Sequence, residues 1–182
     1  MSRISIPATL EATPAAAQPM LAQVQKQLGS LPNMFRLVAQ SPAALEGYLG
    51  LSAALGKSSL PMALRESLAL ALAEFNGCSY CLSAHAFVGE KLAKLSVEEI
   101  AANRKGSSVD SKTQAALRFA LKIAETRGHL GDGDLSSLRL AGFDDAQVIE
   151  IVLLVALNIL TNYLNEVAQT DIDFPRIQDV AA

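Results

Sequence analysis

Apolar side chains recur every three or four positions through most of the chain, which is the spacing of one face of an α-helix. Leu21, Val24 and Leu28 show this spacing in the first such segment, and Gly29 follows them as a helix-stop signal. No segment shows the two-residue alternation of a strand between hairpin turns. The pattern therefore predicts an all-α fold.

Caps, prolines and glycines divide the chain into about seven to nine predicted helices. Thr13-Pro14 is expected to start the first of them, with Thr13 as N-cap and Pro14 in the first helical position. The later predicted helices cover 33–40, 42–56, 61–76, 78–95, a short segment from 96, 112–127, a short segment ending at 142, and 144–169.

We expect the whole chain, residues 1–182, to form a single helical domain, because its length suits one apolar core. Residues 1–12 carry no helical pattern and are predicted to be an extended lead-in. Residues 171–182 are predicted to be a C-terminal tail, interrupted by Pro175.

Composition adds an expectation about partners. Apolar residues make up 51% of the chain, and its mean hydropathy is +0.28. Both values are high for a soluble monomer, so further copies of the chain are expected to cover part of the apolar surface. The net charge of −3, without a basic block, argues against a nucleic acid or an anionic membrane as partner.

Two further observations concern location. The most apolar stretch, 148–160, contains Glu150 and Asn158 and is too short to cross a bilayer. The N-terminal segment has no apolar core of signal-peptide length. We therefore expect a cytoplasmic protein.

The two cysteines, Cys78 and Cys81, form a C-x-x-C pair directly after the predicted helix stop at Asn76-Gly77. In a reducing compartment, such a pair indicates redox or metal chemistry. Unpaired N–H groups and the dipole at a helix N-terminus favour a thiolate, and thiol pKa values there fall from about 8.5 to roughly 3.5–7.5. The spacing of three also permits a disulfide across one turn. Because Cys81 lies one turn deeper, we expect it to be less exposed than Cys78.

His85 and Glu66 are the candidate proton-transfer groups beside this pair. His85 follows Cys81 by one helical turn, within reach of a hydrogen bond directly or through one water. Its ordinary pKa lies near neutrality. Glu66 lies twelve residues before Cys78, on the preceding helix. If the turn folds that helix back, Glu66 meets His85 and orients it, although spacing alone does not establish the meeting.

The pattern Glu66-x11-Cys78-x-x-Cys81-x3-His85 resembles the motif of AhpD-like alkylhydroperoxidases, within the carboxymuconolactone decarboxylase superfamily. The segments LPNMFRLVAQSPAALEGYLGL and LAGFDDAQVIEIV resemble the peroxidase-related members, and the resemblance spans roughly residues 28–175. It implies an AhpD-like helical bundle without a cofactor. It also implies a homo-oligomer, often a trimer or hexamer, although the sequence leaves a dimer open.

The resemblance also implies a reaction. Glu66 and His85 would relay a proton from Cys81, which would attack a hydroperoxide and become a sulfenic acid. Cys78 would then condense with Cys81 to a disulfide. A dithiol, such as the lipoyl group of a partner protein, would reduce the pair. Tyr80 stands where well-studied members carry a second histidine, which bears on the rate and on the choice of reductant. The decarboxylases of the superfamily lack the cysteine pair.

Other interpretations of the motif stay open. Cys78, Cys81, His85 and Glu66 are four candidate zinc ligands, but no second C-x-x-C accompanies them and His129 is far along the chain. The cysteines alternatively are buried, inert thiols, or the dithiol of a redox sensor without turnover. Glu66 and His85 alone would suit a decarboxylase-type acid–base enzyme.

Asn158, Asn162 and Asn165 share one face of the last and most apolar predicted helix. Amides buried there require hydrogen-bond partners. The stripe is interpreted either as hydrogen bonding between helices or subunits, or as the border of the thiol pocket. Tyr80 is interpreted as a packing residue or as a lid over the thiols.

Overall fold

The computed structural model describes residues 2–177, and its helices confirm the all-α prediction. Within this range the chain forms nine helices and no strand. The helices are α1 (Gln18–Leu28), α2 (Asn33–Val38), α3 (Pro42–Gly56), α4 (Met62–Phe75), α5 (Ser79–Lys91), α6 (Val97–Arg104), α7 (Ser111–Thr126), α8 (Asp132–Leu140) and α9 (Asp145–Ala168). Residues 178–182 of the predicted tail lie outside the described residues.

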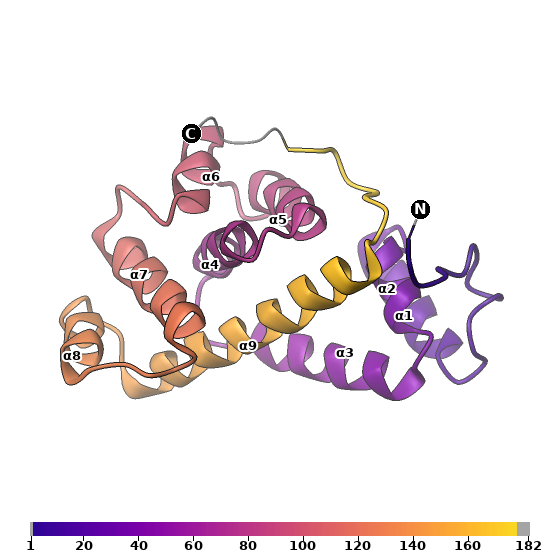
Figure 1. Ribbon diagram of the computed structural model, residues 1–182, viewed down its shortest axis with the longest axis horizontal. Coiled ribbons are helices and arrows are strands. Elements are labelled where there is room, and N and C mark those ends of the chain that lie inside the picture. The colour runs from indigo at the N-terminus through magenta and orange to yellow at the C-terminus, as the bar shows by residue number, and fades with distance from the viewer. Residues whose placement is uncertain (1, 178–182) are drawn as a thin grey trace.

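Helices α4 and α9 form the centre of the arrangement. α4 packs against α5, α6, α7 and α9, and its residues 67–73 are buried without interruption. A helix that is apolar on all sides is stable only when neighbours surround it. α9 crosses the molecule in front of α4 and contacts α3, α4, α5 and α7 (Figure 1). These two helices therefore hold the α4–α5 turn, where the two cysteines lie.

The apolar core has two main parts. The larger part joins α3, α4, α7 and α9 through side chains such as Leu68, Leu117 and Ile151. The second part contains both cysteines and joins α1, α2 and α3 to the start of α5, with Leu21 and Leu45 fully buried. The sulfur atoms consequently lie in an apolar interior that excludes most water.

Three predicted helix starts are confirmed by their caps. Ser41, Ser96 and Asp144 each accept a hydrogen bond from the backbone N–H three residues later. Ser96 and Asp144 also form the reciprocal capping box. The predicted end at residue 95 was wrong, because α5 stops at Lys91 and Lys94 has a left-handed φ of 61°.

The predicted start of the first helix was also wrong. The Thr13 hydroxyl donates backwards to the Leu10 carbonyl and therefore caps no following N–H group. A turn closed by the hydrogen bond from Ala17 N to Pro14 O precedes the helix, which begins at Gln18.

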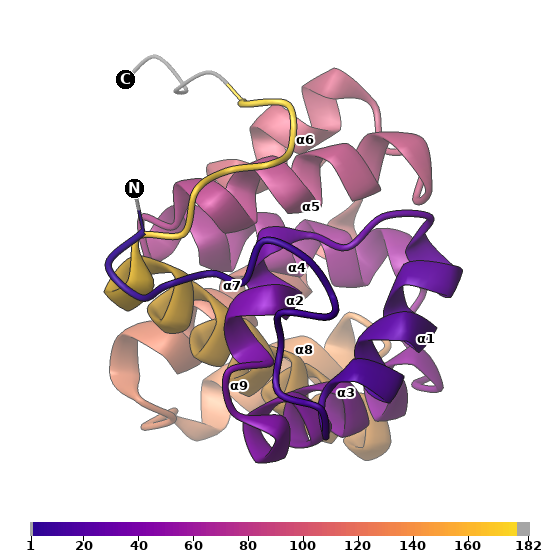
Figure 2. The same cartoon turned by 90° about the vertical axis from the view of Figure 1, so that its right-hand side faces the viewer.

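The lead-in, residues 2–12, is held against the helices at several points. The Arg36 guanidinium donates to the carbonyls of Pro7 and Ala8, and Gln40 Nε2 donates to Ser5 O. Residues 169–177, which we call the C-terminal strap, leave the end of α9 and run back over α5 towards α6 (Figures 1 and 2). The strap is the part of the predicted tail that bears on the site described below.

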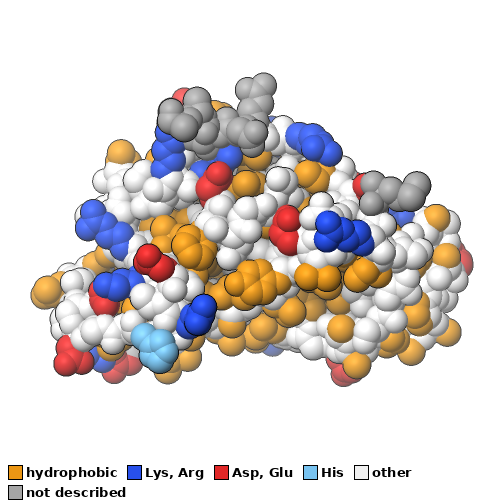
Figure 3. All heavy atoms as spheres, viewed as in Figure 1, with side chains coloured by type: hydrophobic (Ala, Val, Ile, Leu, Met, Phe, Trp, Pro, Cys, Tyr) orange, Lys and Arg blue, Asp and Glu red, His pale blue; other side chains and the backbone are white. Residues whose placement is uncertain are grey.

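The outer face of α9 is apolar and exposed. Its residues recur every three or four positions, and the five larger ones are 45–68% exposed. They are Ile149, Val152, Ala156, Leu160, Tyr163 and Val167. Figure 3 shows a band of hydrophobic atoms across the molecule where α9 runs in Figure 1.

The prediction that this region is too short to span a bilayer was based on residues 148–160 alone. α9 has 24 residues, and by length and composition alone it is long and apolar enough to cross a membrane. That is weak evidence for a span, since core helices of soluble proteins meet the same criteria. The inner face of α9 buries Asn158, Thr161, Asn162 and Asn165 against the protein.

Candidate active site

The turn between α4 and α5 places Cys78 at the N-cap of α5, as predicted. Gly77 has a φ of +69°, a conformation that glycine adopts without strain. The backbone N–H of Cys78 donates to Ala73 O at 2.9 Å, which ties the turn to the end of α4. Cys78 Sγ accepts a hydrogen bond from the Cys81 N–H at 3.3 Å. The first cysteine thus caps the helix that carries the second.

Both cysteines are free thiols, and both are buried. Cys78 is 0% exposed and Cys81 is 3% exposed. The prediction that Cys81 is the less exposed of the two was therefore wrong. The turn holds Cys78 against the end of α4, so Cys78 at the N-cap is buried as completely as Cys81 one turn later.

The two thiols differ in proton affinity. The hydrogen bond between the two sulfur atoms lowers the pKa of Cys81 to about 7 and raises the pKa of Cys78. Burial opposes ionisation of both thiols, while the charge of His85 and the amides of Asn162 and Asn165 favour the Cys81 thiolate. Cys81 is therefore the thiolate of the pair, and Cys78 is the thiol that donates to it.

The structure brings Glu66 and His85 together across α4 and α5. Glu66 Oε2 lies 2.8 Å from His85 Nδ1, and both side chains are mostly buried. Burial works against a charged imidazole, but the Glu66 carboxylate outweighs it and raises the pKa of His85. Because Glu66 engages Nδ1, Nε2 is the nitrogen left for proton transfer. Within residues 2–177, His85 influences Cys81 through charge rather than through a direct hydrogen bond.

The asparagine stripe of α9 reaches the thiols at its C-terminal end. Asn165 Nδ2 donates to Cys81 Sγ at 3.3 Å. The Asn162 amide also favours the Cys81 thiolate, and its Oδ1 accepts from Asn76 Nδ2 at 2.8 Å. Asn158 instead donates to the backbone carbonyl four residues earlier in α9. The stripe therefore borders the thiol pair at two positions and serves its own helix at the third.

Tyr80 is packed against the C-terminal strap. Its hydroxyl donates to Asp173 Oδ1 at 2.9 Å and accepts from Met34 N at 3.2 Å. Its ring meets Phe174 edge to face, with centroids 5.8 Å apart. The interpretation of Tyr80 as a packing residue is confirmed, and its hydroxyl hydrogen-bonds to Asp173 and Met34.

Tyr48, in α3, is a residue near the site that the sequence analysis did not identify as functional. Its ring packs against the core around the cysteines. Burial, followed by the negative charges of Cys81 and Glu66, raises the pKa of its hydroxyl. In the sequence, Tyr48 is one of several apolar positions of its helix, and no motif distinguishes it.

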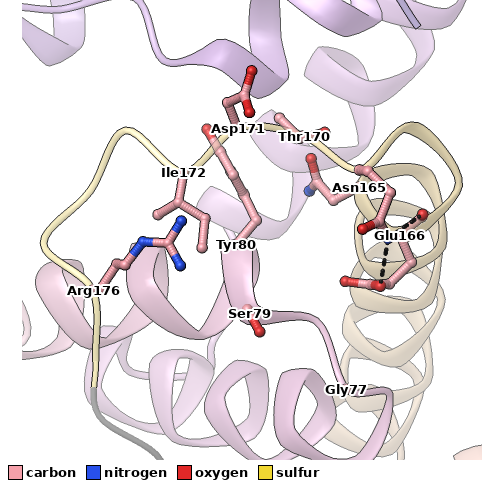
Figure 4. A pocket seen from close by; sticks show the side chains of 10 residues that line it. Gly77, Ser79, Tyr80, Asn165, Glu166, Thr170, Asp171, Ile172 and Arg176 are labelled. Atoms are coloured by element: carbon pink, nitrogen blue, oxygen red, sulfur yellow. Dashed lines mark hydrogen bonds between the residues drawn. The ribbon is translucent and has the colours of Figure 1, made fainter. Parts of the chain in front are cut away.

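A polar hollow of about 320 Å³ lies between the start of α5, the end of α9 and the C-terminal strap, and neither cysteine lines it (Figure 4). Three segments of the chain contribute to its lining. They include Gly77 and Ser79 from the α4–α5 turn, Asn165 and Glu166 from α9, and Thr170 and Arg176 from the strap. These segments are far apart in the sequence, so the hollow has no local motif.

The zinc interpretation is not supported by the arrangement of its four candidate ligands. Among the described residues, no group of three or more His, Cys, Asp and Glu side chains is arranged to hold a metal ion.

Comparisons with known proteins extend these observations. Residues 41–126, which contain the whole motif, match the model of the carboxymuconolactone decarboxylase family. A solved structure described as an alkylhydroperoxidase AhpD core, an uncharacterised peroxidase-related protein from Ralstonia eutropha JMP134, is 26% identical with a TM-score of 0.84. The match covers 94% of this chain and 92% of that one.

Two further solved structures share the fold. A peroxidase-related protein from Silicibacter sp. TM1040 is 24% identical with a TM-score of 0.78, over 87% of this chain and 85% of that one. The debrominase Bmp8 is 20% identical with a TM-score of 0.73, over 94% and 92% of the two chains. No curated protein matches the sequence significantly.

Proposed function

The chain belongs to the AhpD/carboxymuconolactone decarboxylase superfamily, and from this premise we propose that it is a thiol-dependent peroxidase acting through Cys78 and Cys81. One observation carries the proposal. Cys81 Sγ accepts a hydrogen bond from Asn165 Nδ2 at 3.3 Å, the Cys81 N–H donates to Cys78 Sγ at 3.3 Å, and the pKa of Cys81 is lowered to about 7. The Glu66–His85 pair beside it supplies the acid–base groups that a peroxidase requires.

The first step consumes the peroxide. The Cys81 thiolate attacks one peroxide oxygen, so that an S–O bond forms and the O–O bond breaks. The alkoxide that leaves takes a proton from the His85 imidazolium, whose charged form Glu66 stabilises. The products are an alcohol and a sulfenic acid on Cys81, which has given up two electrons.

The second step forms the disulfide. The Cys78 sulfur attacks the sulfenic sulfur of Cys81, an S–S bond forms, and hydroxide leaves with the Cys78 proton as water. The separation of three residues and the hydrogen bond from the Cys81 N–H to Cys78 Sγ keep this step local. An external thiol or dithiol then returns two electrons to the pair. The proposal includes a reducing, cytoplasmic location, where the thiols stay available.

A peroxide challenge of the reduced protein tests this function. Stopped-flow mixing with a small organic hydroperoxide should produce an intramolecular disulfide, seen by mass spectrometry as the loss of two hydrogen atoms. The reaction should be much faster than that of free cysteine at the same pH. Oxidation at the rate of free cysteine would contradict the proposal.

Two rival functions give different outcomes. A decarboxylase-type enzyme using Glu66 and His85 would keep its activity in Cys81→Ser, whereas a peroxidase would lose turnover. A redox sensor would oxidise once and show no steady-state peroxide consumption with a simple dithiol. The debrominase of the same fold shows why the reaction must be measured, since fold alone does not determine chemistry.

We also propose that the chain forms a homo-oligomer through the outer face of α9. The face combines a helical repeat of apolar side chains with an absence of charge at its six positions, which is the pattern of a helix that packs against a partner. A second copy of the chain offers the same face and is self-complementary by symmetry.

Light scattering coupled to size-exclusion chromatography tests the assembly. The wild type should elute as an oligomer, and the double variant Leu160→Glu/Tyr163→Glu should shift to a smaller species. Val109→Glu is the matched control, because Val109 is 96% exposed but lies outside α9. A monomeric wild type at micromolar concentration would overturn the assembly without affecting the proposed chemistry.

A further inference from the structure

The side-chain amide of Asn162 is fully enclosed, and its donor is unused. Asn162 is 0% exposed, and its Nδ2 makes no hydrogen bond within the described residues. The other two asparagines of the stripe, Asn158 and Asn165, both use their Nδ2 groups as donors. Buried polar atoms are almost always satisfied in folded proteins, so an unused donor at this position requires an explanation.

The partner that suits this donor is the sulfur of Cys81. Asn165, three residues later on the same face of α9, donates to Cys81 Sγ at 3.3 Å. The Asn162 amide also favours the Cys81 thiolate and contributes to its lowered pKa. A charged sulfur is a stronger hydrogen-bond acceptor than a neutral thiol. A donor that is unused beside the thiol and used beside the thiolate stabilises the charged form selectively.

Asn76 determines which end of the Asn162 amide is available to the sulfur. Asn76 Nδ2 donates to Asn162 Oδ1 at 2.8 Å, although the two residues are 86 positions apart. No other side-chain hydrogen bond holds Asn162 within residues 2–177. Because its oxygen is held by Asn76, the amide keeps its nitrogen free for Cys81. A turned amide would present an oxygen to the thiolate and would repel it.

The backbone alone does not require an asparagine at this position. Asn76 is the C-cap of α4, with φ −87° and ψ −3°, a right-handed conformation that most residues adopt. The left-handed residue of the turn is Gly77, with a φ of +69°. The Asn76-Gly77 pair was predicted as a helix stop, and Gly77 accounts for that role. The Asn76 side chain is left to act on Asn162.

We propose that Asn76 is a positioning residue for the Cys81 thiolate, acting through the Asn162 amide that its hydrogen bond orients. The inference rests on the proposed function in one respect, namely that this thiolate is the group that attacks the peroxide. The orientation of the amide and its effect on the sulfur follow from the contacts themselves.

Several titratable groups surround the thiol pair and its neighbours. They are Tyr48 of α3, Glu66 of α4, Cys78, Tyr80 and His85 at the start and along α5, Glu166 of α9, and Asp173 of the strap. Asn76 makes no side-chain hydrogen bond to any of them within the described residues. A neutral replacement of Asn76 therefore leaves these groups in place, and its effect on Cys81 passes through Asn162.

The test titrates the Cys81 thiolate by its ultraviolet absorbance in the reduced protein, without peroxide. The diamide-oxidised protein provides the blank. Cys78 stays protonated near neutrality because its pKa is raised, so the step in this range belongs to Cys81. We expect Asn76→Ala to raise the midpoint by about 0.7 pH units, the effect of one net hydrogen bond. Asn76→Asp should raise it by more than about 1 pH unit, because its carboxylate accepts from Asn162 Nδ2 and adds a negative charge.

A double-mutant cycle assigns the effect to Asn162. In an Asn162→Ala background, Asn76→Ala should leave the midpoint unchanged, because the amide that it orients is gone. Asn76→Asp should keep only the part of its effect that comes from charge, and that part should shrink at high salt. Asn162→Leu, of similar volume, serves the same purpose if Asn162→Ala does not fold. Asn158→Ala, whose amide bonds its own helix, is the control and should not move the midpoint.

An unchanged midpoint in Asn76→Ala would overturn the inference. So would a rise of the same size with and without the Asn162 side chain, since Asn76 would then act on Cys81 by another route. Either result would leave the peroxidase standing, because the titration contains no peroxide. Midpoints that follow the cycle, together with a peroxide reaction no faster than that of free cysteine, would reject the peroxidase and keep the positioning role.

Discussion

The thiol pair lies between two walls of different construction. On one side, α4 and α5 supply Glu66 and His85, which neutralise each other across a 2.8 Å contact. On the other side, α9 and the C-terminal strap supply Asn165, Glu166 and Arg176, whose polar groups are partly unpartnered. In the first wall Glu66 and His85 are hydrogen-bonded to each other, whereas in the second wall Asn165 Oδ1 has no hydrogen-bond partner within the described residues.

This difference indicates a division of tasks between the two cysteines. The hydrogen bond from Cys78, followed by the charge of His85 and the amides of Asn162 and Asn165, lowers the pKa of Cys81, as a sulfur that attacks peroxide requires. The second wall places the Glu166 charge near Cys78, whose pKa is raised. Both walls therefore act on Cys81, which reacts with the oxidant in the proposed cycle, whereas the Glu166 charge opposes ionisation of Cys78, which then forms the disulfide.

The largest expected effect comes from removing each sulfur in turn. Cys81→Ser should lose both the first oxidation and turnover. Cys78→Ser should lose turnover but still form a sulfenic acid on Cys81, trapped with dimedone and detected by mass spectrometry. Sulfenic acid on Cys78 in Cys81→Ser, formed as fast as in the wild type, would reverse the assigned roles and break the comparison.

Glu66→Gln tests the first wall. Loss of the carboxylate removes the charge that raises the pKa of His85, so a smaller fraction of His85 carries the proton that the leaving alkoxide requires. We expect the stopped-flow rate of the first oxidation to fall by roughly 10- to 100-fold, at the lower end of general acid–base effects. Glu90→Gln, on the exposed side of α5, is the control. Equal rates for the two variants would remove Glu66 from the mechanism.

The first wall could be predicted from the sequence because its geometry is mostly local. Cys78, Cys81 and His85 are separated by three and four residues on one helix, so their common face follows from helical periodicity. The meeting of Glu66 with His85 required only that a short turn fold two adjacent helices together. The helices of the described residues and the caps at Ser41, Ser96 and Asp144 were likewise accessible from local signals.

The second wall could not be predicted because it depends on contacts between distant segments. Asn165 and Cys81 are 84 positions apart, and the strap reaches α5 only through contacts such as the hydrogen bond from Tyr80 to Asp173. The asparagine stripe was visible as a pattern, but its partner was not. The predicted start at Thr13 was wrong because the Thr13 hydroxyl donates to the Leu10 carbonyl instead of accepting from a following N–H group, as threonine side chains often do in turns.

The pH dependence of the first oxidation tests whether the pKa of Cys81 is lowered while that of Cys78 is raised. Because the pKa of Cys81 is lowered to about 7, its thiolate forms as the pH rises through neutrality. A group with this pKa is about one-tenth ionised at pH 6 and about nine-tenths ionised at pH 8. The stopped-flow rate should therefore rise about ninefold over that interval and level off above it. A midpoint near 8.5, the ordinary thiol value, would mean that the site does not activate Cys81.

The smallest expected effect separates two asparagines of the same stripe. Asn165→Ala removes the hydrogen bond to Cys81 Sγ, so the thiolate loses one stabilising donor. A net loss of about 1 kcal/mol corresponds to about 0.7 pKa units. The midpoint of the pH–rate profile should rise by that amount, and the rate at pH 6, below the midpoint, should fall about fivefold.

Asn158→Ala is the matched control for this measurement. Asn158 is also buried in α9, but its amide donates to its own helix, so its loss should leave the midpoint unchanged. Both variants create a similar small cavity and should lower thermal stability by similar amounts, which separates a packing effect from an electrostatic one. Equal shifts of the midpoint in the two variants would show that α9 acts on Cys81 through packing alone, and the electrostatic contrast between the two walls would then rest on Glu166 and Arg176.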